Sequence, residues 1–112
     1  MQQRAQLFVT DLRQSIRQPV DYATTGEHPA RGEIALHVRN VSPQGFLVDR
    51  AEGLSRADRV IVRMPVVGRI EGCCAWTCGG RAGFQFERII RPDDFAQMIA
   101  AMQPGSGARR AG

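Results

Sequence analysis

Two short clusters of polar residues carry the side chains with which this sequence could bind a ligand. The first contains Arg13 and Arg17, four residues apart, and the second contains Asn40, Ser42 and Gly45. An arginine side chain presents a planar fork that binds a phosphate, or the edge of a guanine base, through paired hydrogen bonds. All 15 basic residues are arginine and the formal net charge is +4, which favours an anionic partner.

Both clusters also have an ordinary structural explanation. Arginines spaced like Arg13 and Arg17 are common as surface charges on a helix or coil, and a GC-rich genome uses arginine in place of lysine throughout. Asn40 and Ser42 have the side chains that cap a turn between two strands. Neither cluster alone therefore distinguishes a binding site from a surface or a turn.

Alternating apolar residues predict the strands that must position these clusters. Ile34, Leu36 and Val38 fall on one face of a strand, and the Asn, Ser, Pro and Gly residues of 40–45 end it in a turn. The Gly-Gly pair at 79–80 predicts a tight hairpin. Short strands without helices between them favour an antiparallel barrel or sandwich. The predicted strands are 34–39, 46–48, 59–64, 69–78 and 82–87, with an earlier one at 19–23.

The hydrophobic period changes after Arg91, where one amphipathic helix is predicted. Phe95, Met98, Ile99 and Met102 recur at helical spacing and share one face, which we expect to be buried. A proline and two aspartates directly after Arg91 suit the start of a helix. We therefore expect a single helix after the sheet.

Length and composition indicate one globular domain. The chain has 112 residues, of which 43% are hydrophobic and 23% charged, and this excludes a disordered or fibrous protein. No apolar run approaches the roughly 18 to 20 residues that cross a bilayer. The first residues lack the apolar core of a secretory signal, so we expect a cytoplasmic protein. Residues 103–112 are rich in Gly, Ala and Arg and are predicted to form a flexible tail.

The two polar clusters, in this order and with a hairpin-rich sheet between and behind them, resemble the signature of a PilZ domain. That signature is Arg-x-x-x-Arg followed further along the chain by Asp/Asn-x-Ser-x-x-Gly. It is matched here by Arg13 and Arg17 and then by Asn40, Ser42 and Gly45. An Ala-Gly-Phe-Gln-Phe run near the end and a closing helix add to the resemblance.

The resemblance covers residues 12–102 and implies both fold and ligand. The implied fold is all-β, a six-stranded antiparallel β-barrel with a C-terminal α-helix at 19–102. A flexible N-terminal arm at 1–18 would precede it and the tail at 103–112 would follow it. The implied ligand is cyclic di-GMP, a bacterial second messenger.

The resemblance also implies a task for each matched residue. Cyclic di-GMP is a dianion with two guanines, so Arg13 and Arg17 would neutralise phosphates or pair with guanine. Asn40 and Ser42 would donate and accept hydrogen bonds at a guanine edge, and Gly45 would allow an approach that a Cβ would obstruct. Binding would order the arm against the barrel and change the surface offered to a downstream protein partner.

The remaining residues indicate no metal, cofactor or catalytic chemistry. Cys73 and Cys74 are adjacent in a strand and point to opposite faces, so we expect these thiols and Cys78 to be buried and to form no metal site. Neither a Ser/His/Asp order, nor a carboxylate pair, nor a phosphate loop is present. We therefore expect that this protein is not an enzyme and needs no cofactor.

Three functions stay open at this point. The leading one is a cyclic di-GMP receptor that signals to a partner protein, and the alternative is a PilZ-like adaptor that binds partners without the ligand. The third is a small nucleic-acid-binding barrel, favoured by the pI of about 9.8. Trp76, Phe84 and Phe86 share the phase of core positions, so we expect them to fill the barrel and not to form a base-stacking platform. DNA, RNA and membrane partners are accordingly not expected.

Overall fold

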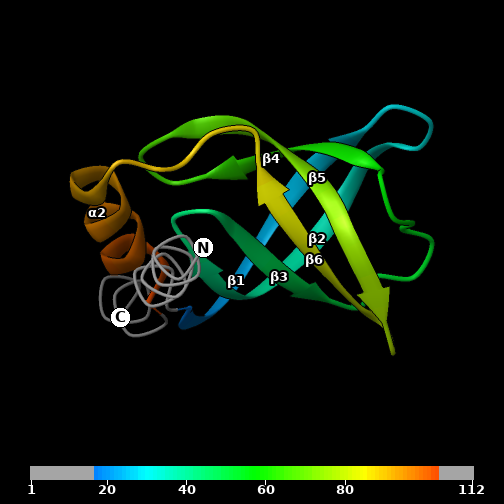
Figure 1. Cartoon of the computed structure of the whole chain (residues 1–112), viewed down its shortest axis with the longest axis horizontal. Coiled ribbons are helices and arrows are strands. Elements are labelled where there is room, and N and C mark those ends of the chain that lie inside the picture. Colours follow the sequence, from blue (N-terminus) through cyan, green and yellow to red (C-terminus); the bar gives the residue numbers. More distant parts are fainter. Residues whose placement is uncertain (1–16, 104–112) are drawn as a thin grey trace, which may run out of the picture.

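Six strands close into an antiparallel barrel in the computed structural model, which describes residues 17–103 (Figure 1). The order around the barrel is β1-β2-β3-β6-β5-β4, and one helix, α2, follows the last strand. The predicted six-stranded antiparallel barrel with a C-terminal helix is therefore confirmed. Most of the predicted arm and tail lies outside the described residues. The elements are β1 (Gln18–His28), β2 (Gly32–Ser42), β3 (Gly45–Asp49), β4 (Arg59–Met64), β5 (Gly68–Cys78), β6 (Arg81–Phe86) and α2 (Pro92–Met102).

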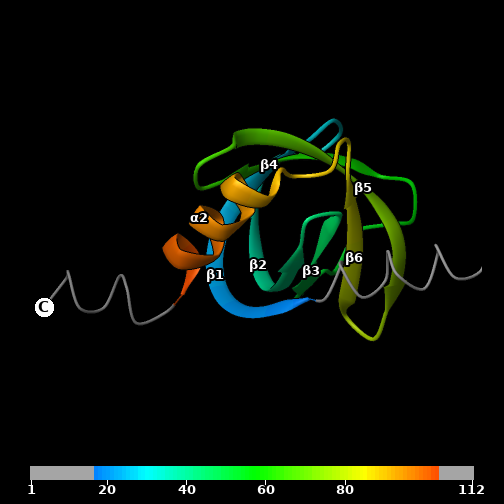
Figure 2. The same ribbon diagram turned by 60° about the vertical axis from the view of Figure 1, so that its left-hand side comes forward.

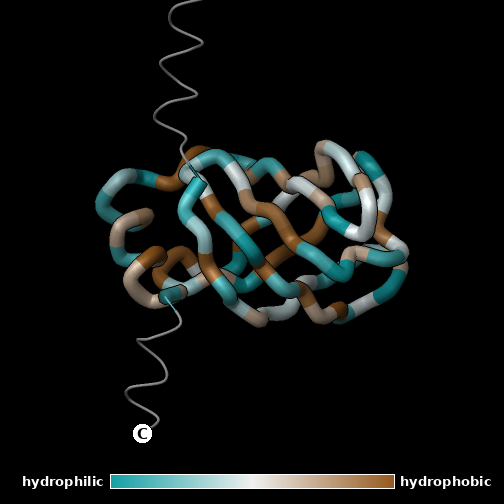
Figure 3. The backbone as a smooth tube through the Cα atoms, turned by 90° about the horizontal axis from the view of Figure 1, so that it is seen from below, coloured by the Kyte–Doolittle hydropathy of each residue, from teal (hydrophilic) through white to brown (hydrophobic). Residues whose placement is uncertain are grey.

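The core lies inside the barrel and is built by the alternating residues. Val60, Val62 and Met64 of β4 are buried, whereas the residues between them are not. Polar and apolar residues also alternate along the crossing strands in Figure 3. At the centre Phe46 and Phe84 stack with ring centroids 4.9 Å apart and planes at 2° to each other. Burial of these side chains is the main force that stabilises the barrel.

β2 is longer than the alternation predicted, and this changes where the second polar cluster lies. The strand continues through Asn40 to Ser42, so only Pro43 and Gln44 form the turn to β3. Its pairing with β3 shifts between Val38 and Asn40, which is a β-bulge. Because the bulge interrupts the period of two, the pattern ended the strand too early.

The prediction that Trp76 fills the barrel is wrong. Its side chain is 38% exposed, whereas Phe84 and Phe86 are buried as predicted. The pairing of β5 with β6 shifts between Cys74 and Trp76. The extra residue at this bulge reverses the phase of β5, so the indole lies on the outer face of the barrel.

The β5–β6 hairpin turns on two glycines, as predicted. Gly79 and Gly80 have φ values of 59° and 81°, and a tight turn of this kind requires positive φ at both positions. Cys78 directly before the turn is exposed. Cys73 and Cys74 differ in burial because they face opposite sides of β5, so the expectation of buried thiols holds for Cys74 alone.

The barrel closes between β1 and β4, and this seam is short. β1 pairs with β2 along most of its length but pairs with β4 only through Gly26 and Glu27. The Thr24 hydroxyl extends the seam by donating to the Arg63 carbonyl at 2.7 Å. A Cβ on Gly26 would lie 2.5 Å from a methyl carbon of Val60, so the absence of a side chain lets the two strands meet.

α2 packs beside β1 at one end of the barrel (Figure 2). Pro92 lies in its first turn, where the missing N–H costs nothing. Met98 and Met102 are fully buried, and Phe95 and Ile99 pack against the core, so the predicted apolar face is confirmed. No helix among residues 17–103 is long and apolar enough to cross a membrane.

Candidate functional site

The structure joins the end of the first polar cluster to the start of the second. The Arg17 guanidinium donates a hydrogen bond from Nη1 to Asn40 Oδ1 at 3.0 Å. Arg17 directly precedes β1, and Pro19 of β1 pairs with Asn40 of β2, so strand pairing brings the two side chains together. Arg13 lies outside the described residues.

A double irregularity of the strands turns Asn40 and its neighbour Arg39 toward solvent. Val38 and Val41 are completely buried, so the two residues between them both project from the outer face. The pairing with β1 is also shifted there, between Pro19 and Tyr22. β-bulges commonly re-aim side chains next to binding sites. Arg39 is therefore a further guanidinium at this place, and the sequence reasoning missed it.

Ser42 has a local structural contact. Its side chain is buried, with 4% exposed, and its hydroxyl oxygen accepts a hydrogen bond from the backbone N–H of Gln44 at 3.3 Å. This is the turn chemistry that the sequence already offered for serine at this position. The contact fixes the two-residue turn that follows Asn40.

Gly45 makes a close approach between strands possible. A Cβ built on this residue would lie 2.0 Å from the carbonyl oxygen of Phe84 on β6. Gly45 pairs with Gln85, so any larger residue here would push β3 away from β6. In this structure the space that the missing side chain leaves is taken by the neighbouring strand.

An apolar strip leads away from Asn40 across the outer face. Asn40 pairs with Leu47 of β3, Leu47 pairs with Gly83 of β6, and Gly83 pairs with Trp76 of β5. The indole lies over Gly83, because a Cβ there would be 2.3 Å from the indole Nε1. One row of the barrel thus carries Asn40, Leu47 and Trp76, and Arg17 contacts its first residue. The glycine opposite Trp76 is the sequence signal that could have indicated the outward indole.

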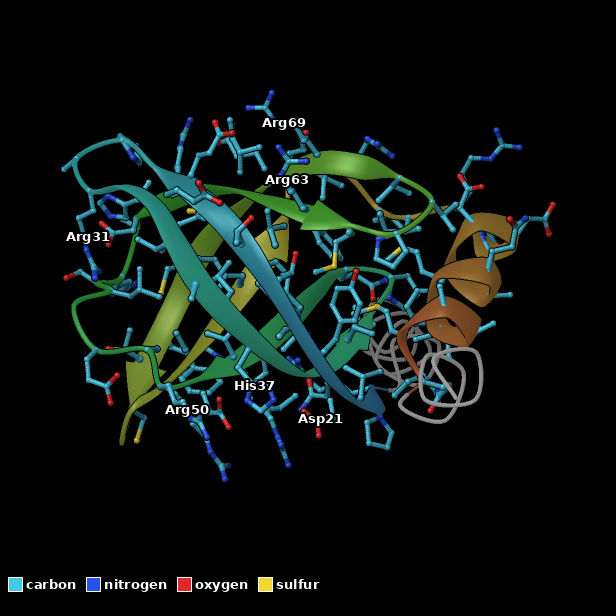
Figure 4. The ribbon with its side chains drawn as sticks, turned by 180° about the vertical axis from the view of Figure 1, so that it is seen from behind. Asp21, Arg31, His37, Arg50, Arg63 and Arg69 are labelled. Atoms are coloured by element: carbon cyan, nitrogen blue, oxygen red, sulfur yellow. The ribbon has the colours of Figure 1, made fainter. Side chains whose placement is uncertain are left out.

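A charged cluster borders the same region on β1, β2 and β3. Both ring nitrogens of His37 contact carboxylates: Nε2 lies 2.5 Å from Asp21 Oδ1 and Nδ1 lies 2.7 Å from Asp49 Oδ1. Arg39 approaches the same carboxylates at 4.0 Å and 3.8 Å. Figure 4 shows Asp21, His37 and Arg50 along one side of the barrel. No group of three acidic, cysteine or histidine side chains within residues 17–103 is suited to hold a metal ion.

These contacts shift the protonation equilibria of the cluster. Hydrogen bonds to Asp21 and then to Asp49 raise the pKa of His37 above its ordinary value of 6.5. The hydrogen bond to His37 holds the pKa of the Asp21 carboxyl below its ordinary value of 3.8. Both shifts favour the ion pair between an imidazolium and a carboxylate.

Four grooves lined by residues within 17–103 lie elsewhere and carry mixed charge. One is lined by Arg59, Glu71 and Cys73 together with Glu87, and Arg59 and Glu71 approach each other at 3.5 Å. Acidic side chains in such a groove disfavour an anionic ligand. The outer face around Arg17 and Asn40 is therefore the candidate site.

Comparison with known proteins gives a structural likeness. No family model and no curated protein match the sequence significantly. The PilZ domain of CeSA from a cellulose-synthesizing bacterium is 17% identical and superposes with a TM-score of 0.56, covering 79% of this chain and 95% of that one. The inhibitor of motility MotI/DgrA from Bacillus subtilis is 22% identical with a TM-score of 0.52, and the match covers 79% of this chain and 48% of that protein. The chain therefore has a PilZ-like fold, the fold that its two sequence motifs implied.

Proposed function

We propose that this protein is a receptor for cyclic di-GMP that signals to a protein partner. The observation that carries this proposal is the hydrogen bond between Arg17 and Asn40, which unites the two halves of the motif on one outer face. A ligand with two phosphates and two guanines offers acceptors for a guanidinium and a base edge for a side-chain amide. Arg17 and Asn40 supply these two groups side by side.

The other residues of the motif support this ligand in different ways. Arg13, four residues before Arg17, supplies a second guanidinium from the preceding segment. Ser42 and Gly45 hold the β2–β3 turn and the β3–β6 contact, which keep Asn40 in position. Ser42 is also proposed to bond a guanine edge, because a hydroxyl that accepts from Gln44 can still donate its own O–H.

The exposed indole adds a stacking surface to the proposal. Trp76 lies in the same row as Asn40, with Leu47 and Gly83 between them. A purine base of a ligand held at Arg17 stacks favourably on such an aromatic and apolar strip. Contact with a base of this kind contributes about 1 to 3 kcal/mol in proteins that bind nucleotides.

The structural neighbours agree with a role in signalling. One is a PilZ domain from a cellulose-synthesizing bacterium and the other is an inhibitor of motility. A small domain that binds a messenger acts through contact with another protein, and no catalytic step is required of it. We propose the same for this chain, with the surface around the Arg17 segment as the part that changes on binding.

Calorimetric titration with cyclic di-GMP tests the proposal. We expect saturable binding with a micromolar dissociation constant, about −8 kcal/mol, which weakens as salt is added. Arg17→Ala is expected to weaken binding by at least about tenfold, because it removes a charge-assisted contact. The control is Arg69→Ala, which loses the same charge from an exposed residue paired with Glu27 at 2.7 Å. Figure 4 places Arg69 on the side of the barrel opposite Asp21 and His37.

Two outcomes of this titration would favour the other functions. No binding up to hundreds of micromolar would reject the receptor and leave the adaptor that works without ligand. Stronger binding of a single-stranded oligonucleotide than of cyclic di-GMP would favour the nucleic-acid barrel. That comparison is needed because Trp76 is exposed. The expected lack of an outward aromatic residue therefore no longer argues against a nucleic-acid-binding barrel.

A further inference from the structure

His37 lies between two carboxylates in a way that requires a particular protonation state. Its Nε2 is 2.5 Å from Asp21 Oδ1 on β1, and its Nδ1 is 2.7 Å from Asp49 Oδ1 on β3. A neutral imidazole has one N–H donor and one acceptor, whereas a carboxylate only accepts. Both short contacts are hydrogen bonds only when the ring carries two protons and a positive charge.

Arg39 competes for the same two carboxylates from a greater distance. Its guanidinium nitrogens lie 4.0 Å from Asp21 and 3.8 Å from Asp49, too far for hydrogen bonds. The side chain is 48% exposed and projects beside Asn40 at the bulge. With His37 protonated, the carboxylates already have close donors, and the N–H groups of Arg39 are available to a ligand.

Loss of the His37 proton would change this balance. One carboxylate would then face a ring nitrogen that carries a lone pair, and the guanidinium of Arg39 would be the nearest cation to replace the missing donor. Arg50, which follows β3, is the other cation whose charge acts on Asp21. Arg39 would be drawn onto Asp21 and Asp49 and away from the outer face next to Asn40.

We propose that protonation of His37 releases Arg39 to contact a phosphate of the bound dinucleotide, and that deprotonation withdraws it. This inference rests on the proposed function. It adds a phosphate contact by Arg39 and its regulation by the protonation state of His37, and neither residue belongs to the two motifs. Asp21, Asp49, His37 and Arg39 together carry no formal net charge when the ring is protonated and one negative charge when it is neutral. A dianionic ligand is therefore bound more tightly on the acidic side of the His37 titration.

The pH window follows from the same contacts. The pKa of His37 is raised by the hydrogen bonds to Asp21 and Asp49, so the ring is protonated at and below its ordinary value of 6.5. It loses its proton only as the pH rises through the raised pKa of the folded chain. A bound dianion raises this pKa further, because it favours the charged ring. Binding at a pH near this folded pKa is therefore accompanied by uptake of a proton at His37.

Titrations of the full chain with cyclic di-GMP between about pH 5.5 and pH 8.5 test the proposal. We expect the affinity of the native chain to fall by about three- to tenfold across this range, the effect of one charge near a dianion. His37→Gln should remove this dependence, whereas Arg39→Gln should reduce it and also weaken binding at the acidic end. The control is His28→Gln, which should keep the full dependence because His28 contacts Asp58 at the other end of β1.

Proton uptake distinguishes control of the ligand from a structural role of the histidine. Titrations in buffers of different ionisation enthalpy should show uptake for the native chain and none for His37→Gln. Binding of equal strength across the range, or native affinity in Arg39→Gln, would overturn the inference while the receptor function stands. Absence of cyclic di-GMP binding at every pH would overturn both.

Discussion

Replacing Gly45 by alanine should destabilise the barrel through a backbone clash. The added Cβ would lie 2.0 Å from the carbonyl oxygen of Phe84 and 3.0 Å from its carbonyl carbon. Carbon and oxygen atoms that are not bonded prefer roughly 3.3 to 3.6 Å, so β3 and β6 must separate by more than about 1 Å. Neither atom belongs to a flexible side chain, and the strain cannot be relieved by a rotamer change.

The size of the effect follows from what this separation disturbs. Gly45 pairs with Gln85, and the next pair is Phe46 with Phe84, whose rings stack at 4.9 Å in the core. Weakening one or two ladder hydrogen bonds costs about 1 kcal/mol each, and forcing apart a packed core adds about 1 to 3 kcal/mol. We expect Gly45→Ala to lower the free energy of unfolding by about 2 to 5 kcal/mol, a large share of the stability of a small domain.

Urea denaturation followed by the fluorescence of Trp76, the single tryptophan, measures this change. The control is Gly68→Ala, because Gly68 has a φ of 74° and a Cβ there meets nothing within 4 Å. That variant places a side chain at a positive φ without a clash, and it should lower the free energy of unfolding by about 1 kcal/mol. Equal losses in the two variants would refute the clash. A Gly45→Ala protein with native stability but no ligand binding would show that the glycine serves the ligand directly.

Three further predictions concern the outer face and the histidines. Gly83→Ala places a Cβ 2.3 Å from the indole of Trp76, so the indole should be displaced into solvent, with a red-shifted emission and cyclic di-GMP affinity lowered about tenfold. His37 has a raised pKa in the folded chain, so the stability that it contributes should be complete below pH 6.5 and lost as the pH rises through the folded pKa. Thermal unfolding of the native chain and of His37→Gln across this pH range measures the loss. Asp58 has a lowered pKa, from hydrogen bonds with Ser55 and His28, so its contribution should be present above its ordinary pKa of 3.8 and lost in acid, and Asp58→Asn should flatten the acid limb of the unfolding curve.

The sequence pattern predicted those strands whose pairing is regular. β4 was predicted with its observed bounds because Val60, Val62 and Met64 alternate without interruption. The helix was predicted equally well, since its four apolar residues keep a helical period. A regular ladder or helix leaves a regular pattern, and simple periodicity is then sufficient.

Bulges and strands of polar residues explain which parts of the fold the sequence pattern did not predict. The bulges before Asn40 and Trp76 reverse the phase of β2 and β5, and they depend on pairing with distant strands. This hid the exposed indole and the continuation of β2 through Asn40. The second half of β1, with Thr24 and Gly26, has little apolar alternation and is a strand because β2 pairs with it. The motif residues of the candidate site were predicted from their types and spacing. The cluster of Asp21, His37 and Asp49 could not be predicted in this way, because its three members lie on three different strands.

The short seam between β1 and β4 determines where the barrel should open most easily. Two residue pairs and one hydroxyl hydrogen bond close it, so the amides of Gly26 and Val62 should exchange with deuterium earlier than those between β3 and β6. Arg17 precedes the same β1 strand whose far end forms this seam. A ligand that binds at the start of β1 should therefore slow amide exchange at the far end of this strand. Slower exchange at Gly26 and Val62 would then report binding at Arg17.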